Sequence, residues 1–368
     1  MRRVLIPLAL IFIIASPARS TTARTSASPS SPKAGQVRFI DAAGRSIALE
    51  GPPRRLVVVG KGPHLILHLL CMFQEGRERL AAYEKRGHSA SDFLDAIDPG
   101  FKEKKTLGIN PGPEEIAALR PDLVLLKGST SERIGEALAG VGIPAAYFSL
   151  ETPDEFYRDL ANLGAILGNQ ARASEIASFF RGRVERVQKA VAGTAEDKRP
   201  RVLLLMATDR GGKYAVQVPA AGWMQTFQVK TAGGRPVWLD AAKTTSGWTV
   251  VNLEQIAAWD PDKVFVVVWH SIDPQTLIDA LKADPQWSAL KAVRSGDLYA
   301  FPEDFFGWDS PDPRWILGLT WLAAKIHPAL FTGLDLKGEV HEFFQKLYGL
   351  DSASIDRVIM PKLRLDVR

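Results

Sequence analysis

A segment that occurs twice in this chain constrains its fold more than any other sequence feature. The residues at 114–124 recur at 254–264, 140 residues further on, with seven of eleven positions identical. Each copy has the pattern of a short helix, a Pro-Asp pair and an apolar strand. The proline disfavours helix at the residue before it, and the aspartate can cap the turn. The repeat therefore predicts two related lobes.

Short apolar runs alternate with helical patterns along the whole chain. The predicted strands are Leu56–Val59, Leu123–Leu126, Ala145–Phe148, Val202–Met206, Val264–Val268 and Leu298–Phe301. The predicted helices include Pro113–Leu119, Ser131–Ala139, Leu253–Ala258 and Pro274–Leu281. Short apolar strands that alternate with helices are typical of parallel sheets covered on both faces. We therefore predict an α/β fold.

One long helix is predicted between the two halves, over 169–193. Asn169 can cap its start, and Ile176, Phe180 and Val187 recur at helical spacing. Roughly 24 helical residues span about 35 Å, and one stiff helix should restrain hinge closure between lobes. The predicted organisation is a signal peptide at 1–20, a flexible leader at 21–36, an N-terminal lobe at 37–168, the linking helix at 169–193, a C-terminal lobe at 194–349 and a C-terminal tail at 350–368.

The first twenty residues predict export from the cytoplasm. Two arginines precede the apolar stretch Val4–Ile14, and small residues follow it, with cleavage expected after Ser20. This stretch is too short to span a bilayer, which needs about 20 residues, although an uncleaved anchor is the alternative. The single cysteine, Cys71, lies far downstream, which excludes an intrachain disulfide and a lipid on a mature N-terminal cysteine. We expect a periplasmic protein that is not a lipoprotein.

The charge balance gives no reason to expect a nucleic-acid partner. The formal net charge is +5, and removal of Arg2, Arg3 and Arg19 with the signal peptide would lower it to +2. A near-neutral body lacks the basic footprint that nucleic acids or acidic membranes attract. Apolar residues make up 46% and charged residues 24%, as in ordinary soluble globular proteins.

The known catalytic motifs are missing or incomplete in this sequence. Gly60-Lys61-Gly62 opens like a dinucleotide-binding fingerprint, but Leu65 stands where the third glycine belongs. Neither a G-x-S-x-G elbow nor a phosphate-binding P-loop is present. His64 and His68 have the i, i+4 spacing that can hold a metal ion on one helix face. We favour the alternative, a helix that packs one histidine at a lobe surface.

Aromatic residues in the second half fall at predicted strand ends and in loops. Trp269 and His270 follow the strand Val264–Val268 and should emerge at its carboxyl end, where open α/β sheets bind ligands. Phe305, Phe306 and Trp308 lie among glycine, aspartate and prolines, which predicts an aromatic-tipped loop. Such side chains could line a pocket for a large, partly apolar ligand. The alternative is that several of them are core residues.

These features together resemble the class III solute-binding proteins of ABC importers, which carry ferric siderophores, haem, cobalamin and some oxyanions or chelated metals. The resemblance runs from about Arg54 to Leu330. It rests on the repeat, the linking helix, Ala232-Gly233-Gly234, the segment from Trp287 to Tyr299, and Ser310-Pro311 with Arg314. It implies two Rossmann-like lobes joined by a single long helix, with the ligand cleft between the lobes.

The resemblance also implies functional residues. Those expected to bind the ligand are Lys61, Tyr83, Lys127, Trp248, Trp269, His270, Phe305, Phe306 and Trp308. Glu114 and Glu254 occupy the positions at which such proteins dock on arginines of the permease, one in each copy of the repeat. The alternative for both glutamates is a solvated carboxylate that the helix dipole favours.

Cationic and aromatic side chains together suit an anionic chelate. The expected ligand is therefore a ferric siderophore or haem, with cobalamin second and molybdate or tungstate third. We expect a monomer without cofactor or catalytic activity, whose partners are this ligand and an ABC permease dimer in the inner membrane. One alternative is an exported metal-dependent enzyme built on His64, His68 and His270. Another is a zinc- or manganese-binding importer component, for which the sequence offers too few histidines.

Overall fold

The computed structural model describes residues 35–86, 90–128, 132–209, 214–268 and 272–365. The predicted signal peptide at 1–20 lies outside the described residues, as does the predicted leader up to residue 34. Within the described ranges, no helix combines the length and apolar character needed to cross a membrane.

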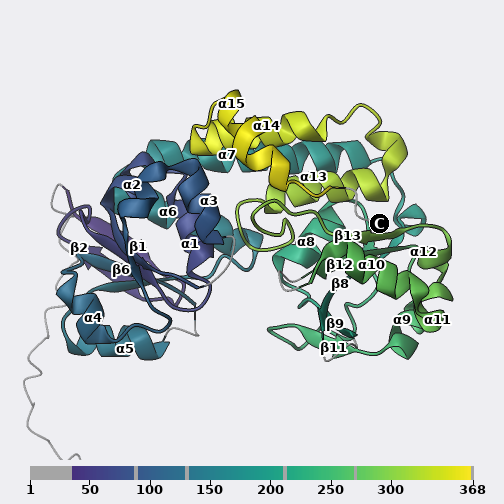
Figure 1. The fold of residues 1–368 in the computed structure, drawn as a ribbon, viewed down its shortest axis with the longest axis horizontal. Coiled ribbons are helices and arrows are strands. Elements are labelled where there is room, and N and C mark those ends of the chain that lie inside the picture. Colours follow the sequence, from purple (N-terminus) through teal and green to yellow (C-terminus); the bar gives the residue numbers. More distant parts are fainter. Residues whose placement is uncertain (1–34, 87–89, 129–131, 210–213, 269–271, 366–368) are drawn as a thin grey trace, which may run out of the picture. The chain divides into compact units, whose positions relative to one another are not determined.

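The first lobe is built on a parallel five-stranded sheet with the strand order β5-β4-β3-β6-β7 (Figure 1). Its strands are β3 (Leu56–Val59), β4 (Leu80–Glu84), β5 (Lys105–Leu107), β6 (Leu123–Lys127) and β7 (Ala145–Phe148). Its helices are α1 (Pro63–Leu70), α2 (Gln74–Arg79), α3 (Ala90–Ile97), α4 (Pro113–Ala118), α5 (Glu132–Gly140) and α6 (Pro153–Leu167). An antiparallel hairpin of β1 (Val37–Ile40) and β2 (Ser46–Leu49) precedes the sheet.

The second lobe has a six-stranded sheet in which β11, β9, β8, β12 and β13 lie side by side and β10 also pairs with β8. Its strands are β8 (Arg201–Asp209), β9 (Tyr214–Val218), β10 (Arg235–Pro236), β11 (Thr249–Val251), β12 (Lys263–Val268) and β13 (Leu298–Ala300). Strand β9 is antiparallel to both neighbours, whereas β8, β12 and β13 are parallel. The predicted α/β fold with two lobes is confirmed.

The helices of the second half surround this sheet and extend beyond it. They are α8 (Met224–Thr231), α9 (Leu253–Trp259), α10 (Pro274–Ala283), α11 (Pro285–Ser288), α12 (Lys291–Arg294), α13 (Trp315–Ile326), α14 (Leu336–Tyr348) and α15 (Ser352–Ser354). All the strands and helices predicted from the sequence are present, with small differences at their ends. The prediction missed the remaining strands, β1, β2, β4, β5, β9, β10 and β11, because they are short, partly exposed or rich in alanine and so lack a strong strand pattern.

The two copies of the repeat adopt the same local structure. Helices α4 and α9 are each followed by a non-glycine residue with positive φ, 47° in the first copy and 38° in the second, directly before the shared proline. From the sequence, the aspartate after this proline was predicted to be able to cap the turn, but it does not do so. Asp122 Oδ2 instead accepts a hydrogen bond from the Arg55 N–H (2.9 Å), and Asp262 Oδ2 accepts one from the Arg201 N–H (2.8 Å). In each copy, this hydrogen bond therefore connects the strand of the repeat, β6 or β12, to the start of the central strand of its sheet, β3 or β8.

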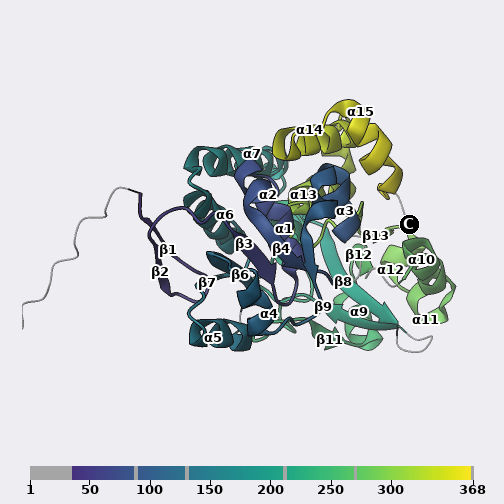
Figure 2. The same ribbon diagram turned by 60° about the vertical axis from the view of Figure 1, so that its left-hand side comes forward.

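The predicted linking helix is present as α7 (Gln170–Val191), and the Asn169 side chain caps it by accepting from the Arg172 N–H at 3.0 Å. Figures 1 and 2 both show α13 and α14 alongside α7. The Phe180 ring on α7 packs against Phe156 on α6 (4.8 Å between centroids) and against Trp315 on α13 (5.3 Å). Helix α7 therefore joins elements of both lobes in one aromatic cluster, which supports the expected restraint on hinge closure.

The predicted C-terminal tail is a packed part of the fold as far as residue 365. Its short helical turns bury Ile355 and Ile359 completely. The backbones of Arg364 and Glu303 exchange two hydrogen bonds, of 2.9 and 3.3 Å, in an antiparallel bridge. The Trp321 indole N–H donates to the carbonyl of Leu365 at 3.0 Å. This segment thus supports the loop that begins at Glu303.

Candidate functional site

The carboxyl ends of β3 and β6 form the first candidate region. These strands are parallel neighbours from which the chain continues toward opposite edges of the sheet, which is the switch point at which open α/β sheets bind ligands. Lys61 follows β3 and is exposed, and Lys127 ends β6. The Lys127 side chain passes over Gly62, because a Cβ atom added there would lie 3.1 Å from Lys127 Cδ. The Lys127 side chain therefore lies beside the turn that carries Lys61.

Lys127 is connected to the second lobe through Glu151. Its ammonium group forms an ion pair with the Glu151 carboxylate. The Glu151 carbonyl accepts a hydrogen bond from the N–H of Met224, the first residue of α8, at 2.8 Å. Trp223, directly before α8, makes an edge contact with the predicted ligand residue Trp248 at 5.8 Å between ring centroids. Lys127 therefore lies on one side of the Glu151–Met224 hydrogen bond between the lobes, and the Trp223–Trp248 pair lies on the other side.

The predicted aromatic loop meets helix α1. The half-buried Phe306 ring lies 4.5 Å from the His64 imidazole, centroid to centroid, at an interplanar angle of 49°. His64 and the predicted residue Tyr83 also line a pocket of about 10 Å³, with room for about one water molecule. The pocket is completed by Pro63, Leu67, Glu84, Arg86 and Leu94. Tyr83 is otherwise buried, so this pocket is where its surface could meet a bound molecule.

Arg86 is a candidate residue that the sequence analysis missed. Its guanidinium pairs with the Glu84 carboxylate at 2.6 Å and donates to Asn110 Oδ1 at 2.8 Å. The Glu84 carboxylate is buried and also accepts from the N–H groups of Gly60 (2.6 Å) and Asn110 (3.1 Å). Arg86 lies two residues after β4, so recognition of β4 as a strand would have placed it at the sheet's carboxyl edge.

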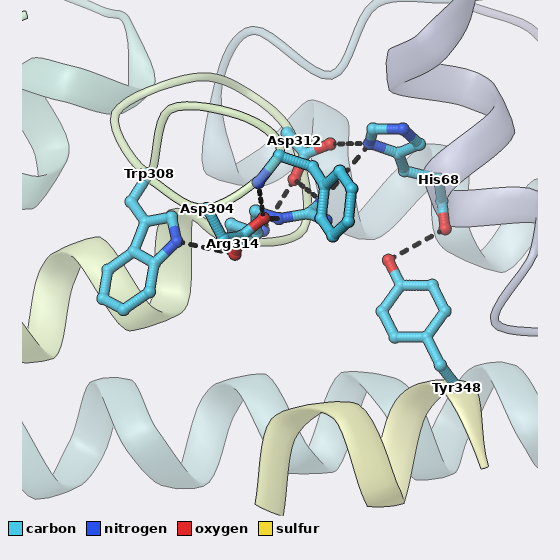
Figure 3. Close-up of polar contacts among 7 residues, drawn as sticks. His68, Asp304, Trp308, Asp312, Arg314 and Tyr348 are labelled. Carbon is cyan, nitrogen blue, oxygen red and sulfur yellow. Dashed lines mark hydrogen bonds and ion pairs between the residues drawn. The ribbon is translucent and has the colours of Figure 1, made fainter. Parts of the chain in front are cut away.

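A buried polar network supports the aromatic loop (Figure 3). Arg314 lies between two carboxylates, with its Nε 2.6 Å from Asp304 and its Nη1 2.9 Å from Asp312, and none of these side chains is exposed. Asp312 also binds Nδ1 of His68, which comes from α1 of the first lobe. The Tyr348 hydroxyl on α14 donates to the carbonyl of His68 at 3.1 Å. Burial alone would raise the pKa of Asp312, but the Arg314 guanidinium and then His68 hold it well below its usual range.

Trp308 belongs to this network and not to a surface open to a ligand. Its side chain is completely buried, and its indole N–H donates to Asp304 Oδ2 at 3.0 Å. Phe305 is also nearly fully buried, close to the Lys362 ammonium group at 5.8 Å. The burial of Trp308 follows from the network, because its indole contacts the carboxylate that Arg314 neutralises. Of the three aromatic residues in the loop, Phe306 is the one with appreciable exposed surface.

The histidines do not form a metal site in the described part of the chain. The rings of His64 and His68 are 6.0 Å apart, and His68 is already bound to Asp312. Among the described residues, no group of three or more His, Cys, Asp or Glu side chains could hold a metal ion. His270, the third histidine of the metal-dependent alternative, lies outside the described residues, and so does the predicted ligand residue Trp269.

Another buried carboxylate in the aromatic loop, that of Asp309, predicts a pH-dependent stability. Burial raises the pKa of Asp309 to about 6, and hydrogen bonds from the Gln225 amide, at 3.5 Å, and from its own backbone N–H offset this rise only in part. The folded protein therefore holds an unfavourable buried charge above pH 6, and protonation removes this penalty as the pH falls toward 4. Replacement of Asp309 by asparagine should raise the free energy of unfolding at pH 8 by up to about 3 kcal/mol.

Denaturant unfolding at pH 8 and pH 4.5 tests this expectation. The gain from Asp309→Asn should largely disappear at the lower pH. The control is Asp279→Asn, because Asp279 is an exposed carboxylate on α10 and its replacement should show no such dependence. An equal gain at both pH values would mean that the buried charge is not the cause.

Glu114 and Glu254 lie at matching places in the two lobes. Each is exposed in the first turn of its short helix, α4 or α9. In each helix the buried isoleucine two residues later, Ile116 or Ile256, faces the core and fixes the outward face. The structure therefore presents one exposed glutamate from each lobe in the same local setting.

Comparison with known proteins identifies the class of protein to which this chain belongs. Residues 85–305 match the family model described as "Periplasmic binding protein". The chain is 24% identical over 257 residues to the molybdate-binding protein MolA of Haemophilus influenzae, covering 64% of this chain and 69% of MolA. It is also 24% identical over 195 residues to the Fe(3+)-citrate-binding protein YfmC of Bacillus subtilis, covering 53% of this chain and 58% of YfmC.

Solved structures show the same fold. The structure of MolA bound to molybdate superposes with a TM-score of 0.68 at 19% identity, covering 85% of this chain and 98% of MolA. A periplasmic solute-binding protein of Veillonella parvula superposes with a TM-score of 0.68 at 20% identity, covering 88% of this chain and 97% of that protein. The class is therefore that of the solute-binding components of ABC importers. This chain belongs to the periplasmic binding protein family, and the resemblance found in the sequence is confirmed.

Proposed function

We propose that this protein captures an anionic iron chelate in the periplasm, of the ferric siderophore type with carboxylate or similar oxygen ligands, and delivers it to an inner-membrane permease dimer. The observation that carries this proposal is the position of Lys61 and Lys127 at the carboxyl ends of β3 and β6, the switch point of the first sheet. The Lys61 ammonium group, together with the Lys127 ammonium group that Glu151 holds at this edge, favours a negatively charged ligand. Phe306 and Trp248 supply aromatic surface for the organic part of a chelate.

The size of the aromatic surface bears on the choice of ligand. With Trp308 and Phe305 buried, less aromatic surface is left for a large planar ligand such as haem, or for cobalamin, than the sequence analysis expected. The similarity to YfmC, named as a Fe(3+)-citrate-binding protein, supports a compact ferric carboxylate. The second candidate is molybdate or tungstate, which the similarity to MolA supports and which needs cationic donors but no aromatic wall.

The proposed export route follows from the N-terminal sequence and from Cys71. We infer that a signal peptide is cleaved after Ser20 and that the mature protein is a monomer without a lipid anchor. Cys71 is completely buried, and burial raises the pKa of its thiol to about 12. A thiol of this kind is inert toward modification.

Replacement of Lys127 tests the anionic ligand. Lys127→Met should weaken binding of ferric citrate, or of molybdate, by about tenfold or more, which corresponds to about 1.4 kcal/mol. It should also reduce the salt dependence of the dissociation constant, because one attractive charge is lost. Glu151→Gln should act in the opposite direction and strengthen binding, since it removes the carboxylate that pairs with Lys127. Tryptophan fluorescence titrations at two salt concentrations measure both effects.

The matched control is Lys198→Met. Lys198 is an exposed lysine in the turn before β8, at the amino end of the second sheet. Its replacement should leave both the affinity and the salt dependence unchanged. Binding of both anions by Lys127→Met with wild-type affinity would contradict the proposal. Retained stoichiometric zinc after chelation, with no binding of either anion, would favour the metal-dependent alternatives.

We also propose that Glu114 and Glu254 dock on cationic groups of the permease, one in each half of its dimer. The support is their identical place in the two copies of the repeat and their exposure. Charged groups at such surfaces act mainly on the rate of encounter and on orientation.

A further inference from the structure

Each lobe exposes a large apolar side chain a few residues before its repeated helix. Ile109 is 62% exposed and lies five residues before Glu114, and Val250 is 71% exposed and lies four residues before Glu254. The described part of the chain has five exposed large hydrophobic residues, and these two are the ones next to the repeat. Ile109 lies two residues after β5 and Val250 lies in β11, the edge strands that lead to α4 and α9 in their respective sheets.

Rigid backbone fixes the exposure of both residues. Asn110, directly after Ile109, has a φ of 55°, and its N–H donates to the buried Glu84 carboxylate at 3.1 Å. Val250 pairs with Gln217 of β9, and the alternation of the strand sends the next residue, Val251, into the core. Neither apolar side chain can therefore be buried without disruption of the local hydrogen bonds or of the strand register.

We propose that Ile109 and Val250 are paired apolar anchors for the permease dimer, each inserting into a recess beside the cationic group that receives the neighbouring glutamate. This inference rests on the docking role proposed for Glu114 and Glu254 and adds the residues that hold the complex together. Each lobe presents an exposed apolar side chain and, a few residues later, an exposed glutamate. The partner must therefore have two equivalent surfaces, each with an apolar recess next to a cationic group. Apolar burial would govern dissociation, whereas the carboxylates would govern encounter.

A photo-crosslinking amino acid, p-benzoylphenylalanine, placed at position 109 or 250 of the full-length protein tests the surface in cells that express the importer. Crosslinks from both positions to the membrane-spanning subunits of an ABC permease, identified by mass spectrometry, are the expected result. Val141 and Leu330 are the control positions, because both are exposed apolar residues outside the segments that lead into the repeated helices. No permease crosslink above these controls at either position would overturn the inference.

Substitution separates this inference from the docking role of the glutamates. Ile109→Ser combined with Val250→Ser should weaken binding to the purified permease in nanodiscs by about tenfold or more, with an unchanged melting temperature and an unchanged salt dependence. Val141→Ser combined with Leu330→Ser is the matched control and should bind like wild type. If charge reversal at the glutamates abolishes binding while the serine variant binds normally, the anchor role is wrong and the docking role stands. If neither change affects binding, both proposals fail.

Discussion

Replacement of Arg314 by methionine is expected to lower the free energy of unfolding by about 3–5 kcal/mol, because it leaves two buried carboxylates without their cation. Asp304 and Asp312 lie 2.6 and 2.9 Å from the guanidinium and are completely buried. The loss should shrink as the pH falls. Without Arg314, the depressed pKa of Asp312 should rise, and protonation then removes the unpaired charge. Denaturant unfolding at several pH values measures the effect.

An exposed arginine provides the control for this variant. Arg364→Met breaks an ion pair with Asp273 in which both side chains are about half exposed, so its effect should be far smaller than that of Arg314→Met. Asp304→Asn and Asp312→Asn, added to Arg314→Met, should recover part of the lost stability, since no buried charge is then unpaired. A loss below about 1 kcal/mol for Arg314→Met alone would show that the carboxylates find other partners or water.

Reversal of the two exposed glutamates is expected to abolish transport and to leave the folded protein intact. In Glu114→Lys combined with Glu254→Lys, two attractive contacts with the permease become repulsive, and like charges that face each other at an interface cost several kcal/mol. Uptake of radiolabelled ferric citrate or molybdate by cells that carry only this variant should fall to background. Ligand affinity should not change, because neither glutamate belongs to the proposed ligand region.

The control variant carries the same change in net charge elsewhere on the surface. Glu136→Lys combined with Asp279→Lys places the reversals on the exposed faces of α5 and α10. Transport by this control should remain close to that of the wild type. Normal uptake by the Glu114 and Glu254 variant would mean that these residues are solvated helix-start carboxylates, the alternative that the helix dipole also explains.

The repeat shows why much of the fold could be predicted from the sequence. A short helix stopped by a proline and followed by an apolar strand is a local pattern, and the same hydrogen bonds support both copies. The long helix followed from a similarly local signal, a capping asparagine and apolar residues at helical spacing. Strands such as β5 were missed because an exposed edge strand carries little apolar pattern.

The candidate site could be predicted only in part. The places of Lys61 and Lys127 at the carboxyl edge of the sheet could be predicted because each lies at or just after the end of a buried strand, and the order of parallel strands puts such ends at one edge. Arg86 was missed because its place depends on β4, and His64 was considered only as a metal ligand because its contact with Phe306 depends on the packing of a distant loop against α1. Trp308 was predicted to face the ligand because a loop rich in glycine and proline suggests exposure, but the Asp304–Arg314 pair draws its indole into the core.

By itself, the sequence determined the class of fold, the two related lobes, the linking helix and the position of one exposed glutamate in each lobe. All of these depend on short-range periodicity, on capping and on the conformational limits of proline, which act within a few residues of the chain. Only the tertiary structure decided which aromatic side chains are buried and which lysine is paired, and it alone showed that His68 of the first lobe joins Asp312 and Arg314 of the second half. Those contacts join residues far apart in sequence, and the desolvation that decides between core and surface acts only after they have formed.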